Sequence, residues 1–425
     1  MSNLKETGIQ WFPKIKSEWK VGKIKEVFDI SKELSTKISP TVLSLARAEV
    51  KIRDVSNNEG QLAASYENYN TVEVGDLLLN PMDLYSGANC NVSYVEGVIS
   101  PAYINLRAKT KMEPRYYDFY FKIQYWTMAM FAHGKGVSFD NRWTINNETL
   151  LNYEIPIPTF EEQVQIVSVL DKKINQIEAL ISNQEKQIEI LNEYKQAIIT
   201  KVVTKGLNED EVLKDSGVEW MGKIPSNYKM ISMKYLGVVR NGLTYSPEDI
   251  TSEDKGTLVL RSSNIQNGKI VYDDNVYVSS IIKDDLIVKK NDILICSRNG
   301  SKKLIGKNVI IEEDNGYSFG AFMMIFRPYS ASKYLYYILN SSIFSFYLGT
   351  YLTSTINQLT GSNFNNMIVP FCEDPVLQNK IVEYLDRKCS KIESLLEIKY
   401  KKIEMLQEYK KSVIYEYVTG IKQMA

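Results

Sequence analysis

The sequence has 425 residues, which at roughly 150 residues per domain is enough for two or three domains with their own cores. Hydrophobic residues make up 44% of it and charged residues 24%, so a largely disordered or fibrous chain is excluded. Lysine plus arginine and aspartate plus glutamate balance at 51 each, which excludes a histone-like role in coating a polyanion. Any nucleic-acid binding must come from local patches.

The cysteines and histidines exclude further kinds of site. Cys90, Cys296, Cys372 and Cys389 are widely spaced, and His133 is the one histidine in the sequence. Zinc fingers, two-histidine metal sites and a disulfide framework are therefore excluded, and a reducing compartment fits. The first ten residues lack the apolar run of a signal peptide, and no stretch reaches the ~18 apolar residues of a membrane helix. We expect a soluble, cytoplasmic protein.

The chain is a tandem repeat. Residues 4–11, LKETGIQW, return without a gap as residues 213–220, LKDSGVEW. Residues 163–171, QVQIVSVLD, return as residues 378–386, QNKIVEYLD, and the agreement continues to Val203-Thr204 and Val418-Thr419. Each half therefore has a variable region followed by a helical region. Short β-branched and aromatic runs broken by Gly, Asn, Ser and Pro predict α+β domains for the variable regions.

The repeat predicts four segments along the chain. They are a first variable domain at 1–158, a helix at 159–208, a second variable domain at 209–374 and a second helix at 375–425. Apolar residues recur at alternating steps of three and four from Val167 to Val202, and again from Val382 to Tyr417, which is the pattern of a coiled coil. The predicted start and stop signals are Thr159 with Glu162, Asp374 with Pro375, and the glycines Gly206 and Gly420.

The two helices have two possible partners. Each helix can pack on its own domain, but five heptads exceed what one small domain covers, so we expect the helices to pair with each other. Because the first helix leaves one variable domain and enters the other, that pairing must be antiparallel. The predicted seam includes Ile181, Gln184, Ile188, Leu396, Lys399 and Ile403, with Gln184 opposite Lys399.

Several motifs together resemble the DNA specificity subunits of Type I restriction-modification enzymes. The SGVEW-GKIP motif lies at 216–225 with a degenerate copy at 7–16, and IPIP-FEEQ--I---LD lies at 155–171 with a copy near 374–386. GDLLLNPMDL at 75–84, SPAY at 100–103, RSSNIQNGKI at 261–270 and NDILICSRNGS at 291–301 are similar to that family's target-recognition domains. The first copy departs from the pattern, with Pro13 and Lys16 where the second has Gly222 and Pro225.

The resemblance implies both a fold and a role. It implies two α+β target-recognition domains separated by two long helices that form an antiparallel coiled coil, as a pseudo-two-fold tandem repeat. The role implied is to read a bipartite, asymmetric double-stranded DNA site and to position two modification subunits, which methylate adenine, and two restriction subunits, which carry the motor and nuclease. The chain itself is expected to be non-catalytic and to bind no cofactor. S-adenosylmethionine, ATP and Mg are expected on the partner subunits.

Candidate DNA-binding residues follow from loop position and side-chain chemistry. Arginine can bind guanine O6 and N7, asparagine can bind adenine N6 and N7, and small residues let the backbone approach. In the first domain the candidates are Arg47, Arg53, Asn80, Met82, Ser86, Lys135 and Arg142. In the second domain they are Arg261, Ser262, Asn264, Arg298, Asn299, Ser301 and Lys302. Since neither domain is strongly basic, we expect partner subunits to neutralise many of the phosphates.

Other functions explain the same sequence motifs less well. Residues 80–83, NPMD, lack the second proline and the aromatic residue of the adenine methyltransferase motif, and residues 300–307 only approximate a phosphate loop. We expect His133 to be a solvent-exposed loop residue rather than part of a phosphate-binding turn. A self-sufficient methyltransferase lacks its motifs. The remaining alternative is a coiled-coil adaptor that joins proteins without sequence-specific DNA contact.

A length change in the first helix tests the expected pairing. Inserting four residues near Gln184, about one helical turn, should displace one domain by ~6 Å along the helix. We expect the methylated motif to keep both half-sites and to change only the spacer between them, as read by sequencing methylated DNA from cells. An unchanged spacer, or altered half-site bases, would show that the helices do not set this distance.

Overall fold

The computed structural model describes residues 4–37, 39–55, 65–82, 84, 90–136, 143–208, 210–352 and 357–422. The chain divides into two compact units. Unit 1 contains residues 1–184 and 400–425, and unit 2 contains residues 185–399. Each long helix, α4 (Phe160–Lys205) and α8 (Pro375–Val418), contributes one part to each unit. The four sequence segments and the two units therefore divide the chain differently.

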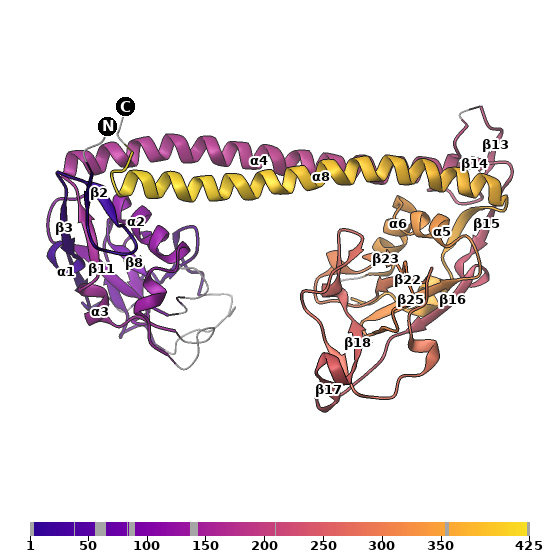
Figure 1. The fold of residues 1–425 in the computed structure, drawn as a ribbon, viewed down its shortest axis with the longest axis horizontal. Coiled ribbons are helices and arrows are strands. Elements are labelled where there is room, and N and C mark those ends of the chain that lie inside the picture. The colour runs from indigo at the N-terminus through magenta and orange to yellow at the C-terminus, as the bar shows by residue number, and fades with distance from the viewer. Residues whose placement is uncertain are drawn as a thin grey trace. The chain divides into compact units, whose positions relative to one another are not determined.

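Unit 1 is an α+β domain with a stretch of each long helix beside it (Figure 1). Its shorter helices are α1 (Ile24–Val27), α2 (Pro114–Trp126) and α3 (Asn147–Leu151). Its strands are β1 (Leu4–Glu6), β2 (Lys14–Lys16), β3 (Lys20–Lys23), β4 (Phe28–Ser31), β5 (Leu43–Leu45), β6 (Val50–Ile52), β7 (Asn70–Val72), β8 (Leu77–Leu79), β9 (Cys90–Val92), β10 (Gly97–Ile99), β11 (Ile104–Ala108) and β12 (Glu154–Ile157). The central sheet has the antiparallel order β4-β11-β8-β9.

Unit 2 repeats this arrangement. Its shorter helices are α5 (Ser332–Ile338), α6 (Ser342–Tyr351) and α7 (Gly361–Asn365). Its strands are β13 (Leu213–Asp215), β14 (Lys223–Pro225), β15 (Tyr228–Ser232), β16 (Gly237–Asn241), β17 (Ile250–Thr251), β18 (Thr257–Leu260), β19 (Ile265–Gln266), β20 (Lys269–Ile270), β21 (Tyr277–Val278), β22 (Ile293–Cys296), β23 (Asn308–Ile310), β24 (Ser318–Phe319), β25 (Met323–Pro328) and β26 (Ile368–Cys372). Its central sheet, β16-β25-β22-β23, matches that of unit 1 strand for strand. The predicted α+β tandem repeat is confirmed.

The ends of the long helices follow the predicted signals. Thr159 and Glu162 form a capping box, with the Glu162 backbone N–H donating to Thr159 Oγ1 at 3.3 Å and the Thr159 N–H donating to Glu162 Oε2 at 3.1 Å. Asp374 Oδ1 accepts the Val376 N–H at 2.9 Å, with Pro375 at the first helical position. Both helices stop before a glycine in the left-handed conformation, at Gly206 and Gly420.

Each unit core is completed by two helix segments. In unit 1, Leu170 near the start of α4 and Tyr417 near the end of α8 both join the core that covers the central sheet. In unit 2, Val202 near the end of α4 and Leu385 near the start of α8 do the same. Arg115 of α2 makes a bidentate ion pair with Asp171 of α4 in unit 1, and the repeat-equivalent Asp386 binds Lys333 of α5 at 2.7 Å in unit 2.

Within each unit the two helices pair antiparallel. Lys195 Nζ lies 2.6 Å from Glu393 Oε1 in unit 2, and the repeat-equivalent pair Lys410–Glu178 forms in unit 1. Among the predicted seam residues, Ile181, Gln184, Ile188 and Leu396 are buried, while Lys399 and Ile403 are half-buried. The predicted antiparallel pairing is confirmed. The facing of Gln184 and Lys399 stays a prediction.

Aromatic side chains fix the first turns of unit 1. Trp11 stacks on Tyr153 with ring centroids 4.6 Å apart, and His133 packs edge-on against both rings. Trp19 Nε1 donates to Glu162 Oε1 at 3.0 Å. The expectation of a solvent-exposed His133 was wrong, because a short 3₁₀ turn at Met130–His133 directs the imidazole into this aromatic cluster.

The same turn opens a central-sheet hairpin in both units. Gly75 and Asn291 have positive φ, of 95° and 73°, and each precedes a buried aspartate, Asp76 or Asp292. Glycine and asparagine are the residues that accept this conformation most readily. The aspartate accepts the backbone N–H of the residue three positions earlier at 2.9 Å in unit 1 and 2.8 Å in unit 2, and so closes the turn.

An arginine from the adjoining strand neutralises each buried aspartate. Arg107 of β11 binds Asp76 through Nε and Nη2 at 3.1 and 2.9 Å, and Arg327 of β25 binds Asp292 at 2.8 and 2.7 Å. Hydrogen bonding to the carboxylate raises the pKa of both guanidinium groups. Each buried carboxylate thus keeps a charged partner, and removing either partner would leave the other charge unpaired. None of the helices in the described ranges combines the length and apolar character needed to cross a membrane.

Breaking one pair should destabilise one unit. Asp292→Asn should lower the free energy of unfolding of unit 2 by about 2–3 kcal/mol, less than for a fully buried pair because Arg327 is partly exposed. Faster hydrogen exchange at β22 and β25 measures the loss. Asp285→Asn, at an exposed carboxylate, is the matched control and should change stability by less than about 0.5 kcal/mol. Equal effects of the two substitutions would contradict the role given to the buried pair.

Candidate nucleic-acid interface

Four loops of unit 2 meet at one edge of its sheets. They follow β16, β18 and β22 and precede β25, so their tips lie where three strands end and one begins. Leu243 N–H donates to Phe319 O at 2.7 Å, and Gly320 N–H donates to Leu260 O at 2.9 Å. A Cβ on Gly242 would lie 2.1 Å from Gly320 O, so this approach requires glycine. The loop cluster is therefore fixed by backbone contacts.

The basic loop after β22 is tied to the loop after β18. Asn299 Nδ2 donates to Ser262 Oγ at 3.1 Å, and Lys307 Nζ donates to the Ser262 carbonyl oxygen at 3.1 Å. Ser301 N–H donates to Asn299 Oδ1 at 2.9 Å. The structure thus brings together the predicted residues of these two loops. Lys307, which completed the apparent phosphate-loop motif in the sequence, has a structural role here.

Arg261 is oriented by its own turn. Its Nη2 lies 2.7 Å from Asp274 Oδ2 and donates to the Asp274 carbonyl oxygen at 3.0 Å. Asn264 Oδ1 accepts the Arg261 N–H at 2.9 Å, and Asn264 Nδ2 donates to Val271 O at 3.0 Å. Asn264 is only 1% exposed, so a direct base contact would require it to leave these hydrogen bonds. Its role in this structure is to shape the loop.

Arg298 is exposed and lies over an aromatic ring that sequence reasoning did not select. The Arg298 Cζ atom is 5.2 Å from the centroid of Phe322, and Ser301 and Lys302 continue the exposed surface of the same loop. Just before this loop, burial raises the pKa of the Cys296 thiol, so Cys296 is a packing residue. In the sequence, Ala321-Phe322 lies near the position that corresponds to Ala102-Tyr103 in the first half, and this weak similarity is a signal that could have pointed to Phe322.

In unit 1 the loop after β8 occupies the corresponding place. Asn80 Oδ1 accepts the Met82 N–H at 3.0 Å, and the Asn80 carbonyl oxygen accepts the Tyr125 hydroxyl at 2.7 Å. Met82 is 36% exposed. The Pro81 carbonyl oxygen accepts the Ile145 N–H at 3.0 Å, and the neighbouring backbone of Thr144 pairs with that of Lys135. Asn80, Met82 and Lys135 are thus brought into one region.

Two of the three arginine candidates of unit 1, Arg47 and Arg53, lie at the β5–β6 hairpin. Arg47 is exposed at its turn, where Asn91 Nδ2 donates to Ala46 O at 2.8 Å and to Arg47 O at 3.4 Å. Arg53 is half-buried, and its N–H donates to Val42 O at 2.8 Å. The other two candidates, Ser86 and Arg142, lie outside the described residues.

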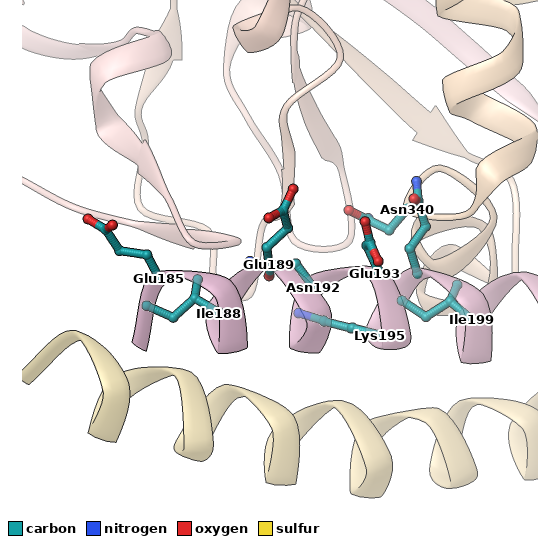
Figure 2. A pocket seen from close by; sticks show the side chains of 9 residues that line it. Glu185, Ile188, Glu189, Asn192, Glu193, Lys195, Ile199 and Asn340 are labelled. Carbon is teal, nitrogen blue, oxygen red and sulfur yellow. The ribbon is translucent and has the colours of Figure 1, made fainter. Parts of the chain in front are cut away.

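A separate hollow of about 630 Å³ lies against α4 in unit 2 (Figure 2). Glu185, Glu189 and Glu193, spaced one helical turn apart, line it together with Asn340 at the edge of the domain. Three carboxylates repel phosphate, so this hollow does not suit nucleic acid. Among the described residues, no group of three histidine, cysteine, aspartate or glutamate side chains could hold a metal ion.

Comparison with known proteins gives one consistent family. The family model described as Type I restriction modification DNA specificity domain matches residues 16–190 and 225–405. The Type I restriction enzyme MjaVIII specificity subunit of Methanocaldococcus jannaschii is 26% identical over 370 residues, covering 82% of this chain and 79% of that protein. The EcoKI specificity subunit of Escherichia coli K12 is 26% identical over 207 residues, covering 47% of this chain and 44% of that protein.

A solved structure shares the fold. It comes from work on complex assembly and conformational transition of a type I restriction-modification system, and it matches with a TM-score of 0.67 and 14% identity. The match covers 96% of this chain and 99% of that chain.

Removing the Arg298 guanidinium should affect one half of a bipartite DNA site. We expect Arg298→Ala to weaken discrimination in that half-site by about 1–3 kcal/mol and to leave the other unchanged. Competition binding with duplexes altered in one half-site at a time measures this. Lys303→Ala, at a neighbouring exposed lysine, is the control and should weaken all sequences alike. An equal loss on specific and random DNA would make Arg298 a phosphate contact.

Proposed function

The chain belongs to the Type I restriction-modification DNA specificity family, and from that premise we propose that each unit reads one half of a bipartite, asymmetric DNA sequence. Recognition of DNA sequence is the role of this family. The observation that carries the proposal is the rigid cluster of loops in unit 2, where Arg261, Ser262, Arg298 and Asn299 meet at one sheet edge. These side chains have the hydrogen-bonding groups that read base edges.

The differences between the two loop clusters support an asymmetric site. The position that holds Arg298 after β22 corresponds to Met82 after β8, since both follow the buried aspartate of the hairpin at the same distance. Arginine and methionine offer different chemistry to a base pair. Two identical units related by a two-fold axis would recognise a palindrome. Because these two units differ, they should recognise different half-sites.

The proposed protein partners are two modification subunits, and the support is a set of exposed apolar residues that the repeat duplicates. Unit 1 exposes Leu180 on α4 with Met405 and Tyr409 on α8, and unit 2 exposes their repeat equivalents. The equivalents are Leu395 on α8 with Ile190 and Tyr194 on α4. Exposed apolar side chains repeated on long helices fit protein docking. The same set presented twice fits two copies of one partner.

A hollow beside this set in unit 2 adds to the proposal. It measures about 580 Å³ and is lined by Tyr194, Ile198, Leu213 and Tyr384, with Lys201 and Lys205 at its polar side. A partner side chain could fill it.

We further propose that two restriction subunits join the complex and that S-adenosylmethionine, ATP and Mg bind on the partner subunits. We also propose that this chain does no chemistry and that the complex works on DNA in the cytoplasm.

The alternative function, a coiled-coil adaptor, has less support. An adaptor needs the two helices but gives no reason for a rigid, arginine-bearing loop cluster with an exposed aromatic ring in unit 2. The balanced charge of the chain is consistent with DNA reading if the partners neutralise phosphate while this chain supplies base contacts.

The methylome of cells with and without the gene tests the proposed function. We expect a bipartite adenine-methylated motif that disappears on deletion and returns when the gene is restored. Extra copies of the modification gene in the deletion strain should leave the motif unmethylated, because the modification subunit is not expected to select the sequence without this chain. An unchanged methylome in the deletion strain would contradict the proposal and favour the adaptor.

Partner stoichiometry tests the duplicated docking set. Tyr194→Asp or Tyr409→Asp should each reduce the bound modification subunits from two to one, and the double variant should bind none, because a carboxylate replaces an apolar contact. Native mass spectrometry of co-expressed complexes counts the subunits. Lys186→Ala, at an exposed residue of the same helix, is the control and should keep two. Two bound subunits in the double variant would place the docking surface elsewhere.

A further inference from the structure

Phe322 is presented to solvent by a backbone that cannot move easily. The residue lies in the tight turn between β24 and β25, where Met323 N–H donates to Gly320 O at 2.8 Å. The Phe322 carbonyl oxygen accepts two further hydrogen bonds, from Ser297 N–H at 2.9 Å and Arg298 N–H at 3.1 Å. The side chain nevertheless remains 58% exposed. The ring is therefore held in a defined place where a ligand can contact it.

The groups around the ring are hydrogen-bond donors. Arg298 places its guanidinium 5.2 Å from the ring centroid, in the range of a cation–π contact. A hollow of about 510 Å³ lies beside the ring, lined by Arg261, Ser262 and Tyr245 among others. Leu243, Ala321 and Met323 also line this hollow, so the ring belongs to an apolar surface that has these donors at its side. A ligand that fits this surface must carry a small apolar group next to hydrogen-bond acceptors.

The major groove of DNA offers that combination at defined places. The C5-methyl of thymine is the apolar group on a base edge there, and guanine presents the acceptors O6 and N7 that suit arginine. Successive base pairs are 3.4 Å apart along each strand, so two side-chain groups 5.2 Å apart can reach neighbouring base pairs. Because Arg298 and Phe322 are joined through a backbone hydrogen bond, the two contacts would be made together.

We propose that Phe322 reads the methyl group of a thymine while Arg298 reads a guanine on the adjacent base pair, in the half-site recognised by unit 2. This rests on the proposed function and adds a specific base step to it. The competing use of an exposed ring is insertion between stacked bases, which kinks the duplex. Insertion depends on stacking and not on the thymine methyl, so the two uses can be separated.

The test uses the full chain assembled with its modification subunits and duplexes that carry the motif found in the methylome. The half-site of unit 2 is the one affected by Arg298→Ala. Thymines in that half-site are replaced one at a time by deoxyuridine, which removes only the methyl group. Guanines are replaced by 7-deazaguanine, which removes only N7. We expect one uracil substitution to weaken binding about fourfold, as for one buried methyl-sized group, and the adjacent 7-deazaguanine to weaken it about tenfold.

Protein variants identify the side chain responsible. Phe322→Ala should remove the penalty for deoxyuridine while keeping that for 7-deazaguanine, and Phe322→Leu should keep part of the first penalty. Tyr329→Ala, at another exposed aromatic residue of the same unit, is the control and should change neither. A 2-aminopurine placed at each base step of the half-site reports unstacking.

Three results would overturn the inference. The first is a half-site in which no base pair with thymine adjoins a base pair with guanine. The second is a loss of binding on deoxyuridine substitution that persists in Phe322→Ala. The third is an increase in 2-aminopurine fluorescence that depends on Phe322, which would show insertion between bases. These results leave the proposed function intact because binding remains sequence-specific. If the assembled complex prefers no sequence at all, the proposed function itself fails.

Discussion

Each unit completes its core with segments of both long helices. Unit 1 buries Leu170 of α4 and Val413 of α8 against the same sheet and helix, and the Tyr116 hydroxyl donates to the carbonyl oxygen of Val418 at 2.7 Å. Unit 2 is closed in the same manner by Val202 and Leu385. Apolar burial is the main favourable term in folding, so each domain depends on helix segments that are more than 180 residues apart in sequence. The long helices are therefore part of both folding units and not linkers between them.

This arrangement separates what the repeat keeps from what it varies. The buried aspartate with its arginine, the left-handed turn residue and the capped helix starts occur in both units, because each satisfies a charge or backbone group that would otherwise be buried without a partner. The loops that follow β8 and β22 carry different side chains at equivalent positions, such as Met82 and Arg298. Stability thus resides in the sheets and helix ends, while the side chains proposed to contact DNA lie in the loops.

The sequence predicted the elements whose signals are local. The coiled-coil spacing, the cap at Thr159 and the stop at Gly206 were visible because neighbouring residues determine them. Loop side chains depend on distant partners. Asn264 was selected as a base contact, yet its amide is used within the loop, and Phe322 was passed over because its exposure results from hydrogen bonds to Ser297 and Arg298. The direction of such a side chain follows from tertiary packing, which composition and spacing do not encode.

The aromatic packing near the start of the chain has a spectroscopic consequence. Four of the five tryptophans, Trp11, Trp19, Trp126 and Trp143, belong to unit 1, and Trp220 alone belongs to unit 2. Trp11 is stacked on Tyr153, whereas Trp220 stacks on the exposed Phe346 with ring centroids 4.0 Å apart. Tryptophan fluorescence of the chain, excited selectively over tyrosine, therefore reports mainly on unit 1, and a Trp220→Phe variant would make it report on unit 1 alone. The unfolding of unit 1 can thus be followed in the intact molecule without any attached dye, and the difference from the unchanged chain gives the signal of Trp220 in unit 2.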